Sequence, residues 1–308
     1  MESMPPRHQL WSPHHLTMRW GYSDEAYKIL STGEIYSLGL EAGDWSDLDW
    51  LTDFRGCLKS IRIGSEVMDW RSIGRLSELQ DLKIEGDFKI KFDFSVLQNL
   101  KSLQMYFRRD YGSSIFQLSG LEYLKINGWK GDDVTAFSKL RKLKYINLID
   151  SKLLKSLKGF EGLGALEGLD IAVANNLTDI GAIGKLGQLK YLKLANCKRI
   201  TAYDCLKFNT ELLSLIIAKT SDIESLSILD GMKKLDYLSF GSGTKVVDGD
   251  LAVLYKLKSL RQCRYTNAQH YNIKKKDFDA HQFEKYGERS VECEDIWLPP
   301  KFRVSLLT

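Results

Sequence analysis

The feature that most constrains this sequence is a spaced set of apolar residues that returns every 21 to 25 residues. The stretch "LKYLKL", residues 189–194, places leucine at its first, fourth and sixth positions. The pattern occurs eleven times, and its first apolar residues are Ile35, Leu58, Leu79, Leu100, Leu121, Leu143, Leu166, Leu189, Leu212, Leu235 and Leu260. Scattered leucines would not return at so regular an interval. Residues 35–266 are therefore predicted to form eleven copies of one structural unit.

Within each unit the apolar residues alternate with other residues, as in a half-buried strand. In "LKYLKL" the period of two places Leu192 and Leu194 on one side and Tyr191 and Lys193 on the other. One such unit cannot bury its apolar side alone, so neighbouring units must stack and share a core. The strands are then expected to form a parallel sheet on the concave side of an arc.

The L-x-x-L-x-L pattern at this interval resembles that of the leucine-rich repeat proteins. The resemblance implies an α/β solenoid, a leucine-rich repeat arc of about eleven units of 21–25 residues. Each unit would give one strand of the concave sheet and one returning segment on the convex side. Because the units are short, the convex segments are expected to be short helical or 3-10 turns.

One position departs from the pattern of these proteins. Three residues after the last apolar strand residue they usually carry Asn or Cys, whose polar group satisfies backbone atoms where the chain turns inward. Here the position reads Glu66, Asp87, Arg108, Trp129, Ser151, Ala174, Cys197, Thr220 and Gly243. We therefore expect irregular turns in the first half of the chain and a tidier solenoid in the second.

The ends of the chain lack the repeat and are predicted to cap the solenoid. Residues 1–34 would form an N-terminal cap, residues 35–266 the solenoid and residues 267–308 a C-terminal cap. Terminal units must differ from the others because an apolar face would otherwise meet water. The aromatic and aliphatic residues Trp11, Leu16, Trp20, Tyr27, Ile29 and Leu30 are expected to cover the first repeat.

Charge and cysteine usage indicate which class of partner the protein binds and in which cellular compartment it acts. Residues 1–57 hold four basic and nine acidic residues, whereas residues 58–266 hold 33 basic and 24 acidic ones. A basic arc favours an acidic partner. The five cysteines form no C-x-x-C pair, and neither a secretory signal nor an apolar run of membrane-spanning length is visible. We expect a monomeric cytoplasmic protein with reduced thiols and no membrane partner.

The sequence offers little for catalysis or cofactor binding. All five histidines lie in the predicted caps, and the neighbouring His14 and His15 lack a third ligand at a metal-binding spacing. The glycine-rich "GSGTK" and "GAIGKL" stretches lack the order of a phosphate-binding loop. We therefore expect no enzyme, no metal and no cofactor.

The outward strand positions are the candidate binding site. Tyrosine stands at the first of these positions in four units, a broken row of cations stands at the second, and the set is Tyr123, Tyr145, Tyr191, Tyr237, Lys83, Lys125, Lys193 and Asp170. Tyrosine is enriched at interface centres, which favours protein binding. Two alternatives stay open. The rings could serve only to stabilise the sheet while the lysines give solubility, or the face could bind nucleic acid, which interspersed carboxylates such as Glu167 disfavour.

A narrower resemblance concerns residues 245–278. With "DGDL" and "HYN", this segment is similar to the ending of stand-alone bacterial cytoplasmic leucine-rich repeat proteins, and "LKSLKGFEGLGALEGLDI" has the same character. Proteins of this type include immunity partners of polymorphic toxins. The resemblance implies that the arc neutralises a cognate toxin by stoichiometric binding. A general scaffold or regulatory adaptor is the rival interpretation.

Overall fold

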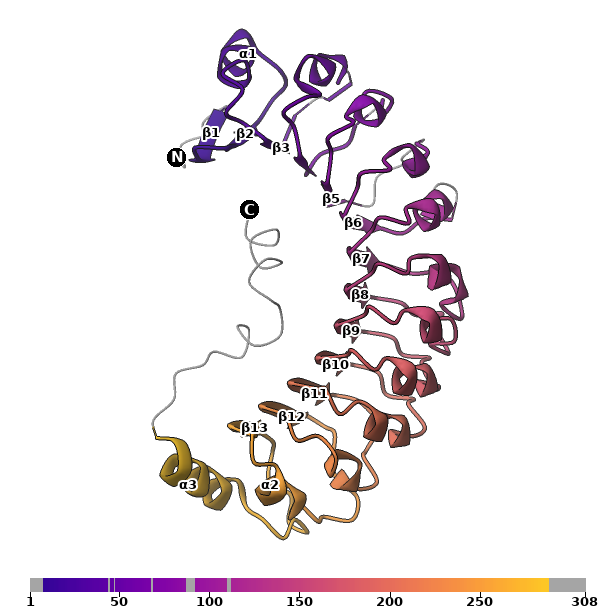
Figure 1. Cartoon of the computed structure of the whole chain (residues 1–308), viewed down its shortest axis with the longest axis vertical. Helices are drawn as coiled ribbons and strands as arrows, with labels where there is room; N and C mark the ends of the chain where they lie inside the picture. Colours follow the sequence, from indigo (N-terminus) through magenta and orange to yellow (C-terminus); the bar gives the residue numbers. More distant parts are fainter. Residues whose placement is uncertain are drawn as a thin grey trace. The chain divides into compact units, whose positions relative to one another are not determined.

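The computed structural model describes residues 8–43, 45–46, 48–67, 69–86, 92–109 and 112–287. The chain divides into two compact units, residues 1–128 (unit 1) and residues 129–308 (unit 2), which are described separately. In each unit, strands and short 3-10 segments alternate along the chain (Figure 1). The predicted leucine-rich repeat solenoid is thereby confirmed.

The described residues of unit 1 form seven strands that follow one another in sequence order. They are β1 (His8–Ser12), β2 (His15–Met18), β3 (Ser37–Leu40), β4 (Ser60–Ile63), β5 (Asp81–Ile84), β6 (Ser102–Tyr106) and β7 (Tyr123–Asn127). The first pair is an antiparallel hairpin, and every later pair from β2 to β7 is parallel and in register. The returning segments are α1 (Asp24–Leu30), η1 (Asp49–Phe54), η2 (Ile73–Arg75), η3 (Phe94–Val96) and η4 (Gly112–Gln117).

Unit 2 continues the same alternation with six strands. They are β8 (Tyr145–Ile149), β9 (Gly168–Ala172), β10 (Tyr191–Ala195), β11 (Ser214–Ala218), β12 (Tyr237–Gly241) and β13 (Gln262–Arg264), all parallel. The returning segments are η5 (Thr135–Lys139), η6 (Phe160–Gly162), η7 (Gly181–Lys185), η8 (Asp204–Phe208), η9 (Leu226–Leu229) and α2 (Val253–Lys256). The unit ends with α3 (Lys275–Tyr286).

The repeated leucines form the core of each unit. In β10 the exposures alternate, so that Leu192 and Leu194 are buried while Tyr191 and Lys193 are partly exposed. The 3-10 segments close the core from the other side with one or two buried side chains each. Examples are Phe137 in η5 and Phe160 in η6, which pack edge to face. This leaves one face of each sheet uncovered by 3-10 segments, and we call it the open face.

The turns after the strands are regular in unit 2, as the sequence predicts. A residue with a left-handed backbone follows each strand from β8 to β12, and the five are Asp150, Val173, Asn196, Lys219 and Ser242, spaced 23 residues apart. The next residue is buried in four of the five turns, as Cys197 shows. After β3, β4, β5 and β6 no described residue up to the next 3-10 segment has this conformation, except Gly43. The tidier second half is confirmed, although β7 of unit 1 is also followed directly by a left-handed residue, Gly128, so the irregular turn expected at Trp129 is not seen in this respect.

The N-terminal region adds strands to the sheet of unit 1. Within the predicted cap, β2 pairs in parallel with β3 and contributes the buried Leu16 and Met18. The expected covering by aromatic residues is partly wrong: Leu30 is buried, but Trp20 and Tyr27 are 45% and 47% exposed. Tyr27 nevertheless contacts Phe54 of η1 edge to face, with ring centroids 5.6 Å apart, while Leu16, Met18 and Leu30 supply the buried aliphatic contacts. The cap boundaries themselves stay a prediction.

Candidate binding surfaces on the open faces

The open face of unit 1 carries a chain of ion pairs that crosses four strands. The Arg19 guanidinium lies 2.7 Å from Glu41, which lies 3.5 Å from Arg62. Arg62 lies 2.7 Å from Glu85, which also accepts from Lys83 at 2.9 Å. Burial opposes ionisation of Glu85, but hydrogen bonds from Arg62 and Lys83 hold its pKa below its usual value. Three cations and two carboxylates thus pair within unit 1, which leaves the ion-pair chain with a formal net charge of +1.

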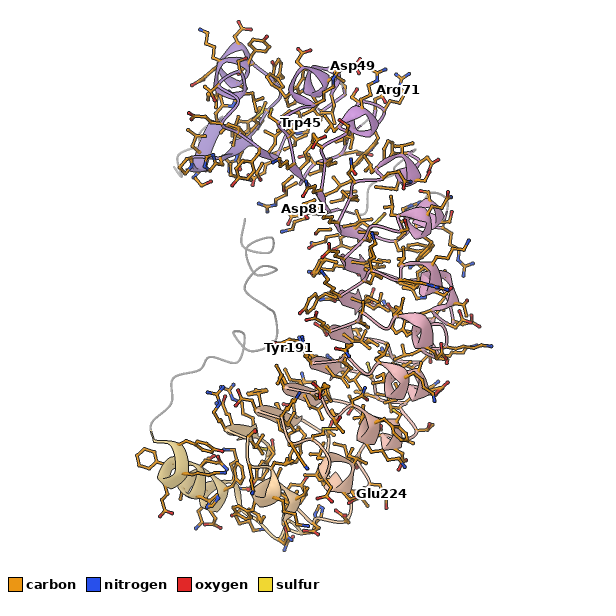
Figure 2. All side chains as sticks on the ribbon, viewed as in Figure 1. Trp45, Asp49, Arg71, Asp81, Tyr191 and Glu224 are labelled. Carbon is orange, nitrogen blue, oxygen red and sulfur yellow. The ribbon has the colours of Figure 1, made fainter. Side chains whose placement is uncertain are left out.

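A half-buried carboxylate lies beside the ion-pair chain. Asp81, at the start of β5, accepts a hydrogen bond from the Ser60 hydroxyl of β4 at 2.9 Å. Burial raises the pKa of Asp81, although hydrogen bonds from Ser102 and Ser60 and the charge of Lys83 act in the opposite direction. Figure 2 shows Asp81 on the open side of its strand, opposite the side on which Arg71 lies. This part of the face is polar and internally satisfied.

The first row of the open face in unit 2 alternates rings with small residues. A Cβ atom on Gly168 would lie 2.4 Å from Cδ1 of Tyr145, so the ring of Tyr145 lies directly over this glycine. In the sequence Gly168 reads as a gap in the row of tyrosines, but in the structure it makes room for one of them. Tyr145 is only 3% exposed, and its hydroxyl donates to Glu167 at 3.3 Å. Burial and then the Glu167 carboxylate raise the pKa of Tyr145.

The tyrosines of unit 2 thus differ in exposure. Tyr237 is fully buried and faces Ser214 across the ladder, whereas Tyr191 is partly exposed. Figure 2 shows Tyr191 on the open side of the sheet. Tyr191 is accordingly the ring of this row with surface left for a partner. The sequence pattern does not predict this difference in exposure, and the role of the four tyrosines as anchors stays a prediction.

The second row is centred on a buried carboxylate. Asp170 in β9 is 3% exposed and lies between two strands, where Lys193 Nζ approaches at 3.4 Å and Asn147 Nδ2 donates at 3.4 Å. Further along the row stand Ile216, which is partly exposed, and Arg264 at the end of β13. The third row is apolar and made of Ile149, Ala172, Ala195, Ala218 and Gly241. The first and third rows of this open face are therefore mainly aromatic or apolar, and the second row is mainly polar.

The eight residues predicted as a site fall in both units. Tyr145, Asp170, Tyr191 and Lys193 lie together on β8, β9 and β10, and Tyr237 lies two strands further on. In unit 1, Tyr123 is 3% exposed and Lys125 is half-buried on the same strand. The Lys83 side chain is 13% exposed and paired with Glu85, so its charge is already balanced. Binding of a partner by these residues stays a prediction.

Sequence reasoning missed the acidic partners of these cations. Glu41 and Glu85 stand one residue after β3 and β5, at positions outside the L-x-x-L-x-L pattern. Their signal in the sequence is weak, because only the parallel register shows that both lie beside Arg62 of the strand between them, although Lys83 and Glu85 are two residues apart on one strand. Alternating charges at the ends of successive strands would have been the feature to look for.

Histidine and cysteine have structural roles where they are described. His15 contacts the hydroxyls of Ser37 and Thr17 at 2.7 and 3.1 Å, and His14 stacks on Tyr36. Within the described ranges no group of three or more His, Cys, Asp and Glu residues could hold a metal. The cysteines at 57, 197, 205 and 263 are free thiols, and Cys293 lies outside the described residues. No described helix has the length and apolar character needed to cross a membrane.

Comparison with known proteins supports the fold. No protein-family profile and no curated protein sequence matches the chain. Among solved structures, the internalin InlF of Listeria monocytogenes is 17% identical with a TM-score of 0.55, over 83% of this chain and 83% of that one. Internalin C2 of the same species is 17% identical with a TM-score of 0.48, over 70% and 84%. A leucine-rich repeat protein of Leptospira interrogans is 18% identical with a TM-score of 0.44, over 82% and 78%.

Proposed function

We propose that this leucine-rich repeat chain is a non-catalytic module that binds a protein partner through the open face of unit 2. The observation that carries the proposal is the composition of that face. A partly exposed ring, Tyr191, and a partly exposed aliphatic residue, Ile216, stand beside a row of small apolar residues. Aromatic and aliphatic groups of this kind form the desolvated centre of protein interfaces, with charges at the rim.

The charges beside this patch favour a partner with acidic groups. Lys190 and Lys193 border Tyr191, and their side chains are 38% and 33% exposed. Each is paired with a carboxylate of the same unit, Glu167 or Asp170, so they contribute to partner selection more than to affinity. The interspersed carboxylates also make a nucleic-acid partner the weaker alternative.

The finer proposal is that binding neutralises a toxin. It rests on the similarity of residues 245–278 to the ending of stand-alone bacterial leucine-rich repeat proteins, some of which are immunity proteins. The protein would act in the cytoplasm as a monomer until it binds, and it would need neither metal nor cofactor. A scaffold or regulatory adaptor would use the same face and differ only in the identity of its partner.

The test compares two variants that carry changes on opposite sides of unit 2. Tyr191→Ala with Ile216→Ser alters the open face, and Phe208→Ser alters an exposed residue, 61% accessible, of the segment η8. Affinity capture from the native host should recover one stoichiometric protein with the wild type and with Phe208→Ser, but about tenfold less with the double variant. Equal capture by the wild type and both variants would place the partner elsewhere.

A second measurement separates neutralisation from scaffolding. The captured protein, expressed alone in a bacterial host, should arrest growth, and co-expression of the wild type should restore it. Growth that is unaffected by the partner would contradict neutralisation and leave the adaptor role. Nucleic acid in place of a protein in the captured material would contradict the protein-binding proposal as a whole.

A further inference from the structure

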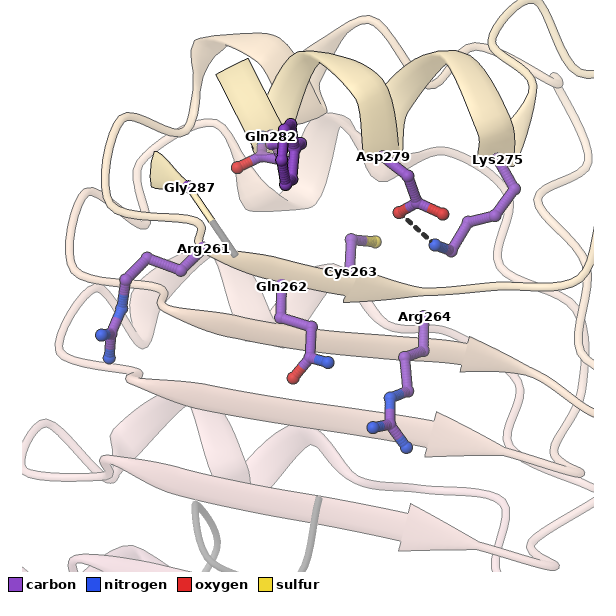
Figure 3. Close-up of a pocket in the computed structure, with 9 residues that line it drawn as sticks. Arg261, Gln262, Cys263, Arg264, Lys275, Asp279, Gln282 and Gly287 are labelled. Carbon is purple, nitrogen blue, oxygen red and sulfur yellow. Dashed lines mark hydrogen bonds and ion pairs between the residues drawn. The ribbon is translucent and has the colours of Figure 1, made fainter. Parts of the chain in front are cut away.

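The last strand of unit 2 borders a pocket that the proposed function does not use. The pocket lies between β13 and α3, has a volume of about 320 Å³, and is lined by Arg261, Gln262, Cys263, Arg264, Lys275, Asp279, Gln282, Phe283 and Gly287. Figure 3 shows Lys275, Asp279 and Gln282 on α3 along one side and the β13 residues on the other. This volume is within the range of ligand-binding pockets.

Two acceptors in the pocket lack donors. Gln282 is only 8% exposed, and its Oε1 atom has no hydrogen-bond partner within the described part of the chain. The Oε1 atom of Gln262 is likewise buried and has no hydrogen-bond partner among the described residues. A buried acceptor left without a donor costs about 1–3 kcal/mol. An occupant that supplied N–H donors would recover this cost.

The strand beside the pocket has an open backbone edge. Among the described strands β13 is the last in the sheet, and it pairs only with β12. The Gln262 N–H donates to Asp236 O at the start of β12, so the N–H and C=O of the next residue, Cys263, face the opposite edge. An extended peptide can pair with such an edge.

The charges of the lining favour a carboxylate. Lys275 is paired with Asp279, and Arg261 with Asp236 (Figure 3 shows the first pair). No ion pair or hydrogen bond of Arg264 is found among the described residues, and the side chain is exposed. The lining thus offers one unpaired guanidinium, which suits a carboxylate.

The rim adds an apolar contact. Phe283 on α3 is 63% exposed and lines the same pocket. A small inorganic anion would pair with Arg264 but would give the two glutamine acceptors no donors and Phe283 no apolar contact. A peptide supplies N–H donors for the glutamines, a carboxylate for Arg264 and an apolar side chain for Phe283.

We propose that the pocket between β13 and α3 binds an extended peptide segment of a partner protein, carrying one Asp or Glu for Arg264 and an apolar side chain for Phe283. The peptide N–H groups pair with Gln262, Gln282 and the open edge of β13. The pocket shares Arg264 with the second row of the open face, but it lies at β13 and α3, away from Tyr191 on β10. It therefore goes beyond the proposed function, and its failure leaves binding at the Tyr191 patch standing.

The experiment uses a phage-displayed library of random dodecapeptides on the immobilised full chain. The library is first depleted on a variant that combines Arg264→Gln with Gln282→Met, so that retained peptides depend on the pocket. The dominant peptide is synthesised, and its affinity is measured by fluorescence anisotropy. We expect an acidic residue next to an apolar one in alternating sequence, and weakening by about tenfold in Arg264→Gln.

Gln282→Met distinguishes a ligand contact from a structural one. It removes the unsatisfied acceptor at nearly constant volume, so it should weaken the peptide several-fold while leaving Tm unchanged or higher. Arg141→Gln, an exposed site outside the pocket, is the matched control and should bind as the wild type does. The proposal is overturned if no peptide survives depletion, if selected peptides lack a carboxylate, or if both pocket variants bind normally. It is equally overturned if a synthetic peptide of residues 288–308 competes for the pocket, because the chain would then supply its own occupant.

Discussion

The two units share one repeat but use their open faces differently. In unit 1 the outward positions hold charges that pair with one another, from Arg19 to Lys83. In unit 2 they hold rings, alanines and two isoleucines, Ile149 and Ile216, with Asp170 buried among them. The leucine pattern specifies only the buried rows, so the alternate positions are free to become a self-satisfied polar network or an apolar surface. When a partner covers an apolar surface, the free energy falls, because apolar groups are removed from water.

The largest expected effect is a difference in stability between variants of two tyrosines of unit 2 that differ in burial. Tyr237→Ala removes a fully buried ring and should lower the free energy of unfolding by about 3–5 kcal/mol. Tyr191→Ala removes a partly exposed ring and should cost less than about 1.5 kcal/mol. Urea unfolding followed by circular dichroism measures both. Equal losses would mean that both tyrosines mainly stabilise the sheet. Unit 2 would then have no ring left for a partner, and its open face would not differ from that of unit 1 in this way.

The next effect concerns the glycine beneath Tyr145. Gly168→Ala places a Cβ atom against the ring and should destabilise unit 2 by about 1–3 kcal/mol. Gly162→Ala, where a Cβ meets nothing within 4 Å, is the control and should change stability by less than about 0.5 kcal/mol. In a Tyr145→Ala background the cost of Gly168→Ala should disappear. A cost that persists there would show that the glycine is needed for another reason.

Unit 1 should respond to pH through Asp81. Because burial raises the pKa of Asp81, the stability that its protonated form contributes is present at acid pH and is lost as the pH rises through the folded-state value. Asp81→Asn should therefore stabilise the chain by about 1 kcal/mol at pH 7, and the gain should vanish at acid pH. Thermal unfolding from pH 3 to pH 8 measures this difference.

Asp93 provides a control because its pKa is shifted downward, whereas that of Asp81 is shifted upward. Hydrogen bonds from the side chain and then the backbone of Ser95 lower its pKa, so its contribution is present above the unfolded-state value and is lost as the pH falls. Asp93→Asn should destabilise at pH 7 and have no effect at acid pH. If Asp81→Asn also destabilised at pH 7, the network around Asp81 would need its charge, and the description of unit 1 as self-satisfied would have to change.

The smallest effect tests the regular turns of unit 2. Lys219 is exposed and has a φ of 53°, a conformation that favours glycine. Lys219→Gly should stabilise the chain by about 0.5–1 kcal/mol, while Lys185→Gly, in the 3-10 segment η7, should not. Differential scanning calorimetry compares the two. A loss of stability at position 219 would show that side-chain contacts outweigh the backbone strain.

The sequence predicts the fold well because its signal is periodic. The rows of Leu192 and Leu194 and their equivalents follow from alternation and spacing alone. The burial of Tyr145 does not follow, because it depends on a glycine 23 residues away that the register brings beneath the ring. The partner of Arg62 was likewise hidden, since Glu85 becomes its neighbour only once β4 and β5 are aligned. The pocket under α3 depends on a helix outside the repeat, for which the leucine pattern carries no information.

The left-handed residue after each strand of unit 2 has an evolutionary consequence. Asp150, Val173, Asn196, Lys219 and Ser242 return the backbone to the same state every 23 residues. A segment that runs from one of these residues to the next therefore begins and ends with the same backbone conformation. Duplication or loss of one such segment in the gene would therefore preserve the register of everything that follows, and unit 2 could change its length in whole repeats while its new strand acquired a different set of surface residues.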